Sequence, residues 1–247
     1  MDLLHGILHY ILKRNYLAPI HKPRAILDVG TGTGIWVREM ATLFPKARVV
    51  GLDALDLIRW NGMPKNATFH FADLAQGLPF PDGSFDYVHY RTSYTHLLHN
   101  GHMPACRELH RLCRSTGWVE VVDIYRRLQN RGPCGERLDN FIAMVLADRG
   151  EGVDRIHRLS HELGAAGFID VTQRVVSLPV GDWGGAPGTL VRRATEMLMR
   201  ALADDVVRLA GDAIDHTQYE ALVDCFLEET ERRQTYMEVY CFTGRRP

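Results

Sequence analysis

Residues 25–34 constrain the fold of this chain more than any other stretch. A short apolar run leads to an acid, Asp28, and then to glycines at alternate positions, Gly30, Gly32 and Gly34. Helical periodicity starts directly after the last glycine, with apolar residues at positions 35, 36, 40, 43 and 44. A buried strand, a glycine turn and a helix in succession are typical of the first unit of a nucleotide-binding α/β fold. Glycine suits such a turn because a ligand can approach its backbone more closely than a Cβ atom allows.

The spacing of the glycines departs from the dinucleotide fingerprint G-x-G-x-x-G. Counted from Gly30, that fingerprint needs its third glycine at position 35, where this chain has Ile35. The string from Leu27 to Gly34 instead resembles motif I of the class I S-adenosylmethionine-dependent methyltransferases. The resemblance implies that the amino-acid moiety of S-adenosylmethionine lies over the glycines. The alternative is an ordinary tight turn between a strand and a helix.

Strands alternate with helices through the first half of the chain. An amphipathic helix with a following turn is expected over residues 1–22, and a second helix over 103–114. Apolar stretches predict strands over residues 49–52, 68–71, 85–89 and 118–122. This alternation favours a parallel sheet whose strand ends meet at one ligand-binding edge.

The second half of the chain has a different pattern of predicted elements, in which helices predominate. Helices are expected over residues 138–149, 154–164, 188–210 and 217–233, and strands over 170–178 and 236–243. We predict an α/β fold, a Rossmann-like seven-stranded mostly parallel sheet with helices on both faces, an N-terminal helical lid and a C-terminal helical insertion. We expect one methyltransferase domain over residues 1–247. Its parts are a lid helix (1–22), a cofactor-binding core (23–125), and substrate-side helices with the last strands (126–247).

Two acids at predicted strand ends support the glycine motif. Asp53 ends the second strand, where Rossmann-type folds place an acid for ribose hydroxyls, and a carboxylate can accept two hydrogen bonds from a vicinal diol. Asp73 ends the third strand and could accept a hydrogen bond from the adenine amine, with Leu74 against the ring. The alternatives are a helix cap for Asp53 and a solvated loop residue for Asp73.

The resemblance extends over most of the chain. Residues 80–88, Phe-Pro-Asp-Gly-Ser-Phe-Asp-Tyr-Val, resemble a further methyltransferase segment. Residues 18–20, 178–183 and 240–247 are similar to the branch related to fungal velvet-complex and trans-aconitate methyltransferase-like proteins. The resemblance implies S-adenosyl-L-methionine as cofactor, held by Asp28, Gly30, Thr31, Gly32, Gly34, Asp53, Ala54, Asp73, Leu74 and Arg91.

Methyl transfer from a sulfonium depends chiefly on placing the acceptor in line with the methyl group, so a general base is optional. His96 follows the fourth strand and is our candidate base, with Asp123 at the end of the fifth strand as a second. His96, His99 and His102 are spaced by three, which also fits a metal triad. We expect no metal, because the segment ends in the turn-forming pair Asn-Gly.

Several side chains near the expected ligand edge could have either a functional or a structural role. Arg91 could clamp a carboxylate or form a structural ion pair. Asp123 could cap a helix instead of acting as a base. Tyr16, Tyr125 and Trp183 are candidate substrate contacts, and Trp60 is another candidate pocket wall. Large aromatic residues also commonly belong to the core.

The composition of the chain limits the kinds of partner that we expect it to bind. The net charge is −1 and suggests no nucleic-acid or acidic-membrane footprint. The sequence shows no apolar run of about 18 residues and no secretory signal, so we expect a cytoplasmic protein. An odd count of 5 cysteines favours reduced, mostly structural thiols. We expect a monomer or homodimer that methylates a small molecule, with oxygen, nitrogen and carbon all open as the acceptor atom. A protein methyltransferase or an interacting regulator is the alternative.

Overall fold

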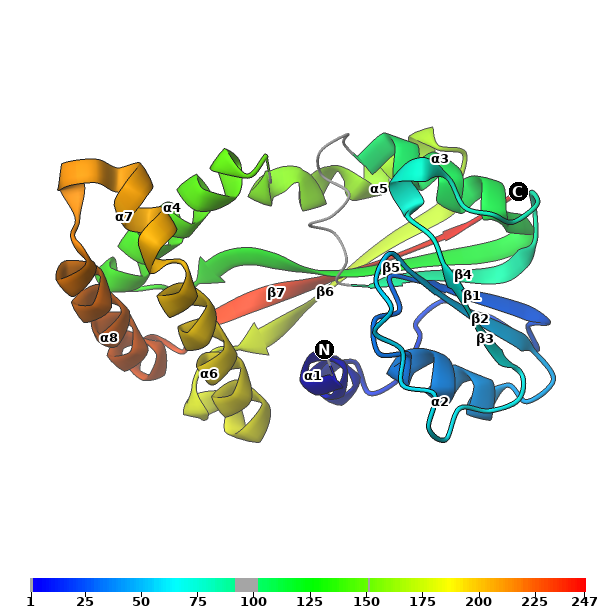
Figure 1. The fold of residues 1–247 in the computed structure, drawn as a ribbon, viewed down its shortest axis with the longest axis horizontal. Helices are drawn as coiled ribbons and strands as arrows, with labels where there is room; N and C mark the ends of the chain where they lie inside the picture. Colours follow the sequence, from blue (N-terminus) through cyan, green and yellow to red (C-terminus); the bar gives the residue numbers. More distant parts are fainter. Residues whose placement is uncertain (1, 92–101, 151) are drawn as a thin grey trace. The chain divides into compact units, whose positions relative to one another are not determined.

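A seven-stranded sheet organises the chain (Figure 1). The computed structural model describes residues 2–91, 102–150 and 152–247. The strand order is β3-β2-β1-β4-β5-β7-β6. β1 pairs in parallel with β2 and β4, β2 with β3, and β4 with β5, which confirms the predicted Rossmann-like, mostly parallel sheet. The strands are β1 (Ala25–Val29), β2 (Arg48–Asp53), β3 (Ala67–Phe71), β4 (Phe85–Arg91), β5 (Cys113–Gln129), β6 (Ile169–Pro179) and β7 (Tyr236–Arg245).

Eight α-helices lie in the described parts of the chain. They are α1 (Asp2–Leu12), α2 (Ile35–Leu43), α3 (His102–Leu112), α4 (Pro133–Asp148), α5 (Leu159–Ala165), α6 (Gly185–Ala201), α7 (Ala203–Ala210) and α8 (His216–Arg233). Each helix that the sequence predicts is present. The predicted helix over 154–164 divides into a 3₁₀ segment, Val153–Arg158, and α5, and the one over 188–210 divides into α6 and α7.

Chain contacts define two compact units. The first unit comprises Met1–Asp123, Ile156–Arg174 and Tyr240–Pro247, and the second comprises Ile124–Arg155 and Val175–Val239. β5, β6 and β7 each contribute residues to both units. The single-domain division with boundaries at residues 22 and 125 stays a prediction.

Within the first unit, helices cover both faces of the sheet. Figure 1 shows α1 and α2 on one side of β1–β4 and α3 and α5 on the other. The face under α2 carries a fully buried core in which Trp36, Val37 and Met40 of α2 pack with Ile26 of β1 and Tyr87 of β4. Because side chains alternate along a strand, this packing puts every second residue of β1 and β4 beneath α2.

β5 is longer than the sequence predicts. The expected helix runs to residue 114 and the expected strand starts at 118, but β5 begins at Cys113 and continues to Gln129. Its pairing with β4 is irregular between Phe85 and Tyr87. Gly117 lies at this irregularity, where an added Cβ atom would come within 2.9 Å of the Asp86 carbonyl oxygen. The early part of β5 also pairs with the end of the chain, since Thr116 donates to the Arg246 carbonyl and Arg246 to that of Gly117.

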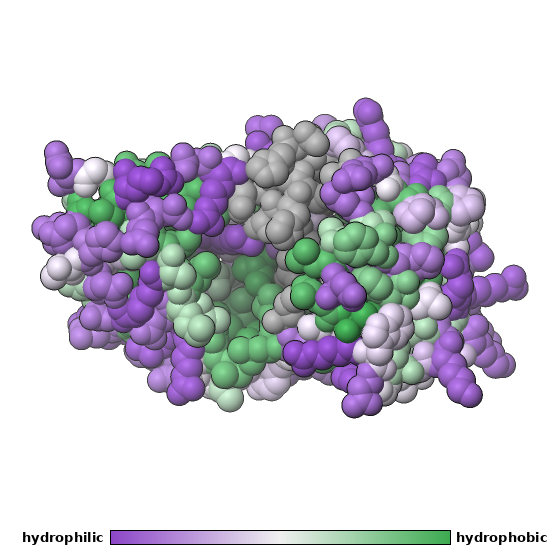
Figure 2. All heavy atoms as spheres, viewed as in Figure 1, coloured by the Kyte–Doolittle hydropathy of each residue, from purple (hydrophilic) through white to green (hydrophobic). Residues whose placement is uncertain are grey.

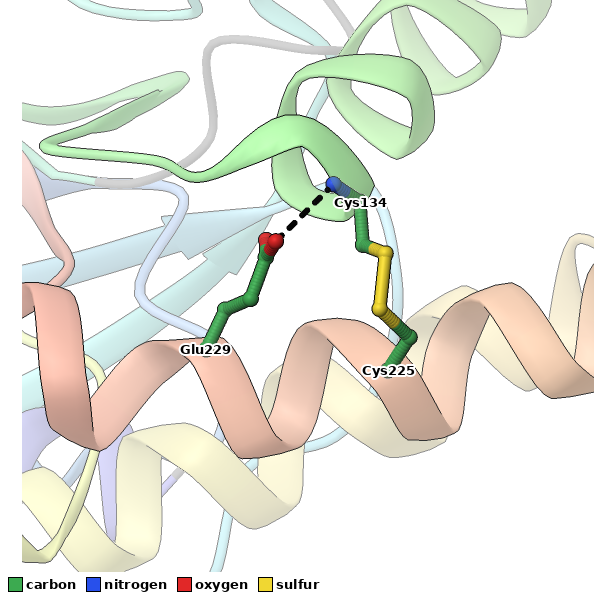
Figure 3. Close-up of side chains that lie close together, drawn as sticks. All are labelled: Cys134, Cys225 and Glu229. Atoms are coloured by element: carbon green, nitrogen blue, oxygen red, sulfur yellow. Dashed lines mark hydrogen bonds between the residues drawn. A yellow bond between two sulfur atoms is a disulfide. The ribbon is translucent and has the colours of Figure 1, made fainter.

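A disulfide joins two helices of the second unit (Figure 3). It links Cys134 of α4 to Cys225 of α8, whose Cα atoms are 6.0 Å apart although 91 positions separate them in the sequence. The expectation of reduced thiols is therefore wrong for this pair. It is confirmed for Cys106, Cys113 and Cys241, which are free and buried. Burial raises the pKa of each of these three thiols to about 12.

Glu229 of α8 caps the start of α4 beside the disulfide. Its carboxylate accepts hydrogen bonds from the Cys134 and Gly135 backbone N–H groups at 3.2 Å and 2.9 Å. These are donors that the first turn of a helix leaves without intrahelical partners. In the described part of the chain, Cys134, Cys225 and Glu229 also have donor atoms within 4.8 Å of one another. Their sulfurs are bonded together and the carboxylate serves α4, so we assign no metal to them.

The visible surface is mainly polar. Figure 2 shows hydrophilic side chains over much of the face viewed, including the region of α7 and α8. Within the described residues, no helix combines the length and the apolar character needed to cross a bilayer.

The disulfide is predicted to stabilise the folded chain. Replacing both Cys134 and Cys225 by serine should lower the free energy of unfolding by about 2–5 kcal/mol, because the unfolded chain loses a cross-link between distant residues. Denaturant unfolding of the native chain and the double variant, with and without dithiothreitol, measures this. The reductant should affect only the native chain. Equal stability of the native chain in both conditions would contradict the prediction.

Candidate functional site

The glycine turn between β1 and α2 has the backbone that its sequence suggests. Gly30, Gly32 and Gly34 have φ angles of 71°, 56° and 78°, in the left-handed region that favours glycine. At Gly34 an added Cβ atom would also lie 2.8 Å from the Ile58 side chain. The Gly30 and Thr31 N–H groups both donate to the Leu52 carbonyl, at 2.8 Å and 3.0 Å. The turn is thus held against the end of β2.

Asp53 at the end of β2 is bonded to this turn. Its Oδ2 accepts a hydrogen bond from the Gly32 N–H at 2.8 Å, and its Oδ1 accepts from the Leu55 N–H at 3.0 Å. Asp53 is half-buried. Each carboxylate oxygen can accept a further hydrogen bond, so the side chain can hold the turn and still accept from a ligand hydroxyl.

Three further residues that the sequence predicts as cofactor contacts lie around the ends of β2 and β3. Ala54 and Asp73 are exposed, while Leu74 is buried at the start of a 3₁₀ turn, Leu74–Gln76. The Ala72 N–H donates to the Asp53 carbonyl at 3.0 Å, which joins the two strand ends. Exposed apolar residues accompany them, namely Leu55, Leu57, Trp60 and Phe71.

Asp28 and Arg91 point to the face of the sheet beneath α1 and α2. Asp28 is 3% exposed, and its Oδ1 lies 2.8 Å from the Nδ1 of His89. Arg91 Nη2 lies 2.6 Å from the Nδ1 of His5 in α1. Burial lowers the pKa of the Arg91 guanidinium, and the nearby Asp28 carboxylate opposes that shift. The structure therefore places Arg91 next to α1, in a polar interior that includes His5 and His89.

Helix α1 is attached beside the glycine turn by two polar contacts. Asp2 accepts a hydrogen bond from the Thr33 hydroxyl at 2.6 Å and pairs with Arg59 at 2.9 Å. His5 lies between Arg91 and Glu39 of α2, with its Nε2 3.1 Å from the Glu39 carboxylate. Thr33 belongs to the turn itself, so α1 contacts both the turn and the adjoining end of β4.

The structure describes only one of the two candidate bases, Asp123. His96 and its neighbour His99 lie outside the described residues, and the side chain of His102 is likewise not described. Asp123 belongs to β5 in the first unit and is 4% exposed. Tyr90, at the end of β4, is also buried. Burial raises the pKa of the Tyr90 phenol, and the Asp123 charge raises it further.

The three candidate substrate contacts all have partners within their own units. Tyr16 packs against Phe44 and Tyr87, with ring centroids 5.7 Å and 6.4 Å away. The Tyr125 hydroxyl donates to Asp154 at 2.7 Å. Trp183 donates its indole N–H to the Thr235 carbonyl at 3.2 Å. The Trp183 backbone N–H donates to Glu231 of α8 at 2.9 Å. Tyr16 thus packs against the core, whereas Tyr125 and Trp183 are half-buried and hydrogen-bonded. A substrate role for the three residues stays a prediction.

Sequence reasoning missed the interior partners of the site. His5 of α1, Glu39 of α2 and His89 of β4 contact Asp28, Arg91 or one another, and none of them was a candidate. Glu120 of β5, on the same face of the sheet as His89, holds the backbone before β1 rather than the site. Glu120 is 1% exposed and accepts from the Leu17 and Ala18 N–H groups, both at 2.7 Å. The available signal in the strands is a polar residue within an apolar run, namely Asp28 in β1, His89 in β4 and Glu120 in β5.

Folded stability should depend on the protonation of His5. Burial lowers the pKa of the His5 imidazole, Arg91 lowers it further, and Glu39 opposes them. The unfolded chain gains a proton at His5 below about pH 6.5, whereas the folded chain resists it, so stability falls as the pH drops below that value. Melting temperatures at about pH 7.5 and about pH 5.5 should therefore differ less for His5→Gln than for the native chain. His21→Gln, an exposed change outside α1, is the control. Parallel pH profiles for His5→Gln and the native chain would refute this role.

Comparison with known proteins shows similarity to methyltransferases and to a regulator of secondary metabolism. A family described as "Methyltransferase domain" matches residues 26–117. An N-methyltransferase of Leptosphaeria maculans, sirN, is 25% identical over 253 residues, which cover 98% of this chain and 89% of the relative. The secondary metabolism regulator LAE1 of Cochliobolus heterostrophus is 31% identical over 206 residues, covering 76% of this chain and 64% of the regulator.

The fold is shared with solved methyltransferases. Phosphoethanolamine N-methyltransferase 2 of Haemonchus contortus, solved with S-adenosyl-L-methionine, superposes with a TM-score of 0.59 at 17% identity. That superposition covers 100% of this chain and 52% of the nematode enzyme. The glycine turn, the strand order and these similarities agree, and the chain is a class I S-adenosylmethionine-dependent methyltransferase.

Proposed function

We propose that this enzyme binds S-adenosylmethionine at the glycine turn and at the ends of β1, β2 and β3, and transfers its methyl group to a small-molecule acceptor. The observation that carries the cofactor site is the link between Asp53 and Gly32. It puts a half-buried carboxylate directly against a turn whose backbone has no side chains at three positions. Parallel strands bring these groups to one edge of the sheet, where ligands of such folds bind.

The residues at this edge fit the chemistry of the cofactor. The ribose of S-adenosylmethionine presents two neighbouring hydroxyls, and Asp53 retains acceptor capacity for them. Asp73 and Leu74, at the adjoining strand end, offer a carboxylate and an apolar side chain for the adenine. We assign the amino-acid moiety to Gly30, Gly32 and Gly34, whose backbone carries no side chains. We assign these roles to them together with Asp28, Thr31 and Ala54, and we keep Arg91 as a member of the site.

When bound, the cofactor supplies an activated methyl group. The residues at the glycine turn and at the ends of β1, β2 and β3 would hold the cofactor so that the acceptor could take this methyl group from its sulfur, and the acceptor would then release any proton that it carried. The protein contributes chiefly by placing the acceptor on the axis of the breaking bond. We propose Asp123 and His96 as candidate proton acceptors, needed most if the acceptor is a hydroxyl.

Similarity to sirN supports a small-molecule acceptor. That relative is named an N-methyltransferase, and its alignment extends over 98% of this chain, beyond the cofactor-binding half. We propose that acceptor specificity is encoded in residues 126–247, and that the acceptor is a specialised metabolite. The near-neutral charge of the chain, −1, does not favour a highly charged polymer as substrate. A cytoplasmic monomer or homodimer stays a prediction.

A regulatory role, or methylation of a protein, is the second candidate. It is favoured by the similarity to LAE1, which is named a secondary metabolism regulator and is 31% identical over 76% of this chain. The two candidates differ in where the methyl group goes.

Turnover with labelled cofactor should distinguish the two. The enzyme is incubated with methyl-labelled S-adenosylmethionine and a fungal extract that is divided into a small-molecule fraction and a protein fraction. We expect S-adenosylhomocysteine to form and the label to enter the small-molecule fraction. Label only in protein would favour the second candidate and reject a small-molecule acceptor.

Asp53→Ala should weaken cofactor binding. The change removes the acceptor for the ribose hydroxyls and for the Gly32 N–H, so we expect a loss of about 1–3 kcal/mol in the free energy of S-adenosylhomocysteine binding. Isothermal titration calorimetry measures it. Asp56→Ala, an exposed change three positions along the chain, is the matched control and should bind like the native enzyme. Full affinity in the Asp53 variant would remove Asp53 from the site.

A further inference from the structure

A buried histidine connects the two elements that flank the glycine turn. Asp28 of β1 and His89 of β4 are direct partners in the parallel pairing of these strands, so their side chains point to the same face of the sheet. His89 Nδ1 lies 2.8 Å from Asp28 Oδ1, and the two residues are 1% and 3% exposed. Asp28 is two positions before the first glycine of the turn.

The same imidazole also contacts the helix that follows the turn. Its ring stacks on the indole of Trp36, with centroids 3.9 Å apart and an angle of 3° between the planes. Trp36 is the second residue of α2, which begins directly after Gly34. The indole is itself fixed, because its N–H donates to the Asn15 carbonyl at 2.8 Å. His89 therefore contacts the chain just before the turn and just after it.

The hydrogen bond from His89 stabilises the buried negative charge of Asp28. A carboxylate this deeply buried is costly unless hydrogen-bond donors or cations compensate it. His89 supplies a donor from the ring nitrogen that faces Asp28, and the Arg91 guanidinium on the same strand adds an attractive charge. Without the imidazole N–H, the Asp28 carboxylate must find another partner. A movement of Asp28 would be transmitted to the glycines that follow it.

We propose that His89 is a positioning residue of this methyltransferase. It holds the Asp28 carboxylate through Nδ1 and packs against Trp36, and so keeps β1, the glycine turn and the start of α2 in the shape that receives S-adenosylmethionine. His89 acts through Asp28 and the turn, without contacting the reacting atoms. This role rests on the cofactor site proposed above.

Calorimetric titration of S-adenosylhomocysteine into full-length variants tests the proposal. His89→Phe retains a flat ring that can stack on Trp36 but has no N–H for Asp28. We expect its dissociation constant to rise about 10–100-fold, the range for a lost hydrogen bond to a buried charged group. The effects of His89→Phe and Asp28→Asn should not add, so the double variant should bind more tightly than the sum of the two single changes predicts, because His89 acts through Asp28.

Glu120→Gln is the matched control for a merely structural effect. Glu120 is equally buried on the same face of the sheet, but it holds the backbone of residues 17 and 18. We expect this variant to melt at a lower temperature than the native enzyme and to bind S-adenosylhomocysteine with about the native affinity. Comparable weakening of binding in Glu120→Gln and His89→Phe would overturn the proposal.

A measurement on the native enzyme covers the case in which His89→Phe does not fold. Nitrogen-15 histidine labelling reports the imidazole signals with and without S-adenosylhomocysteine, and His89→Asn assigns the His89 signal by its loss. We expect the His89 signal to shift on ligand addition while that of exposed His216 stays in place. An unmoved His89 signal, or native affinity in His89→Phe, overturns the proposal alone. No binding by the native enzyme would overturn the cofactor site as well.

Discussion

The hydrogen bond from the Gly32 N–H to the Asp53 carboxylate links the two strand ends that define the ligand edge of this enzyme. It depends on the parallel pairing of β1 with β2, which brings the two segments together even though 21 positions separate the bonded residues. A second support comes from the other neighbour of β1, since His89 of β4 bonds to Asp28. The glycine turn and the strand that leads to it are thus held by polar contacts from both adjacent strands, and this arrangement fixes the shape of the proposed cofactor site.

The second unit is stabilised differently. Side chains of α8 accept hydrogen bonds from backbone N–H groups at the starts of other segments. Glu229 accepts from two backbone N–H groups at the start of α4, and Glu231 accepts from the Asp182 and Trp183 N–H groups. The disulfide between Cys134 and Cys225 adds a covalent link between α4 and α8. Helix ends that lack a local cap are thereby satisfied by residues far along the chain.

Local sequence predicts the parts of the fold that local physics determines. Apolar periodicity gives each helix and strand, and the alternate glycines give a turn that β1 and α2 flank. Pairing between distant segments is not visible in one sequence, which is why the early part of β5, paired with Arg246, was expected to be helical or irregular. The disulfide was missed for the same reason. Asp53 was recognised from its place at a strand end, whereas His89 was passed over because its partner, Asp28, is defined only by the strand register.

The central claim is that S-adenosylmethionine lies over the glycine turn with its ribose at Asp53. A crystal structure of the full chain with S-adenosylhomocysteine tests it most directly. The account predicts ligand density along Gly30, Gly32 and Gly34, with the ribose hydroxyls bonded to Asp53 while the Gly32 contact to that carboxylate is kept. Density for the ligand elsewhere, or a ribose with no contact to Asp53, would contradict it.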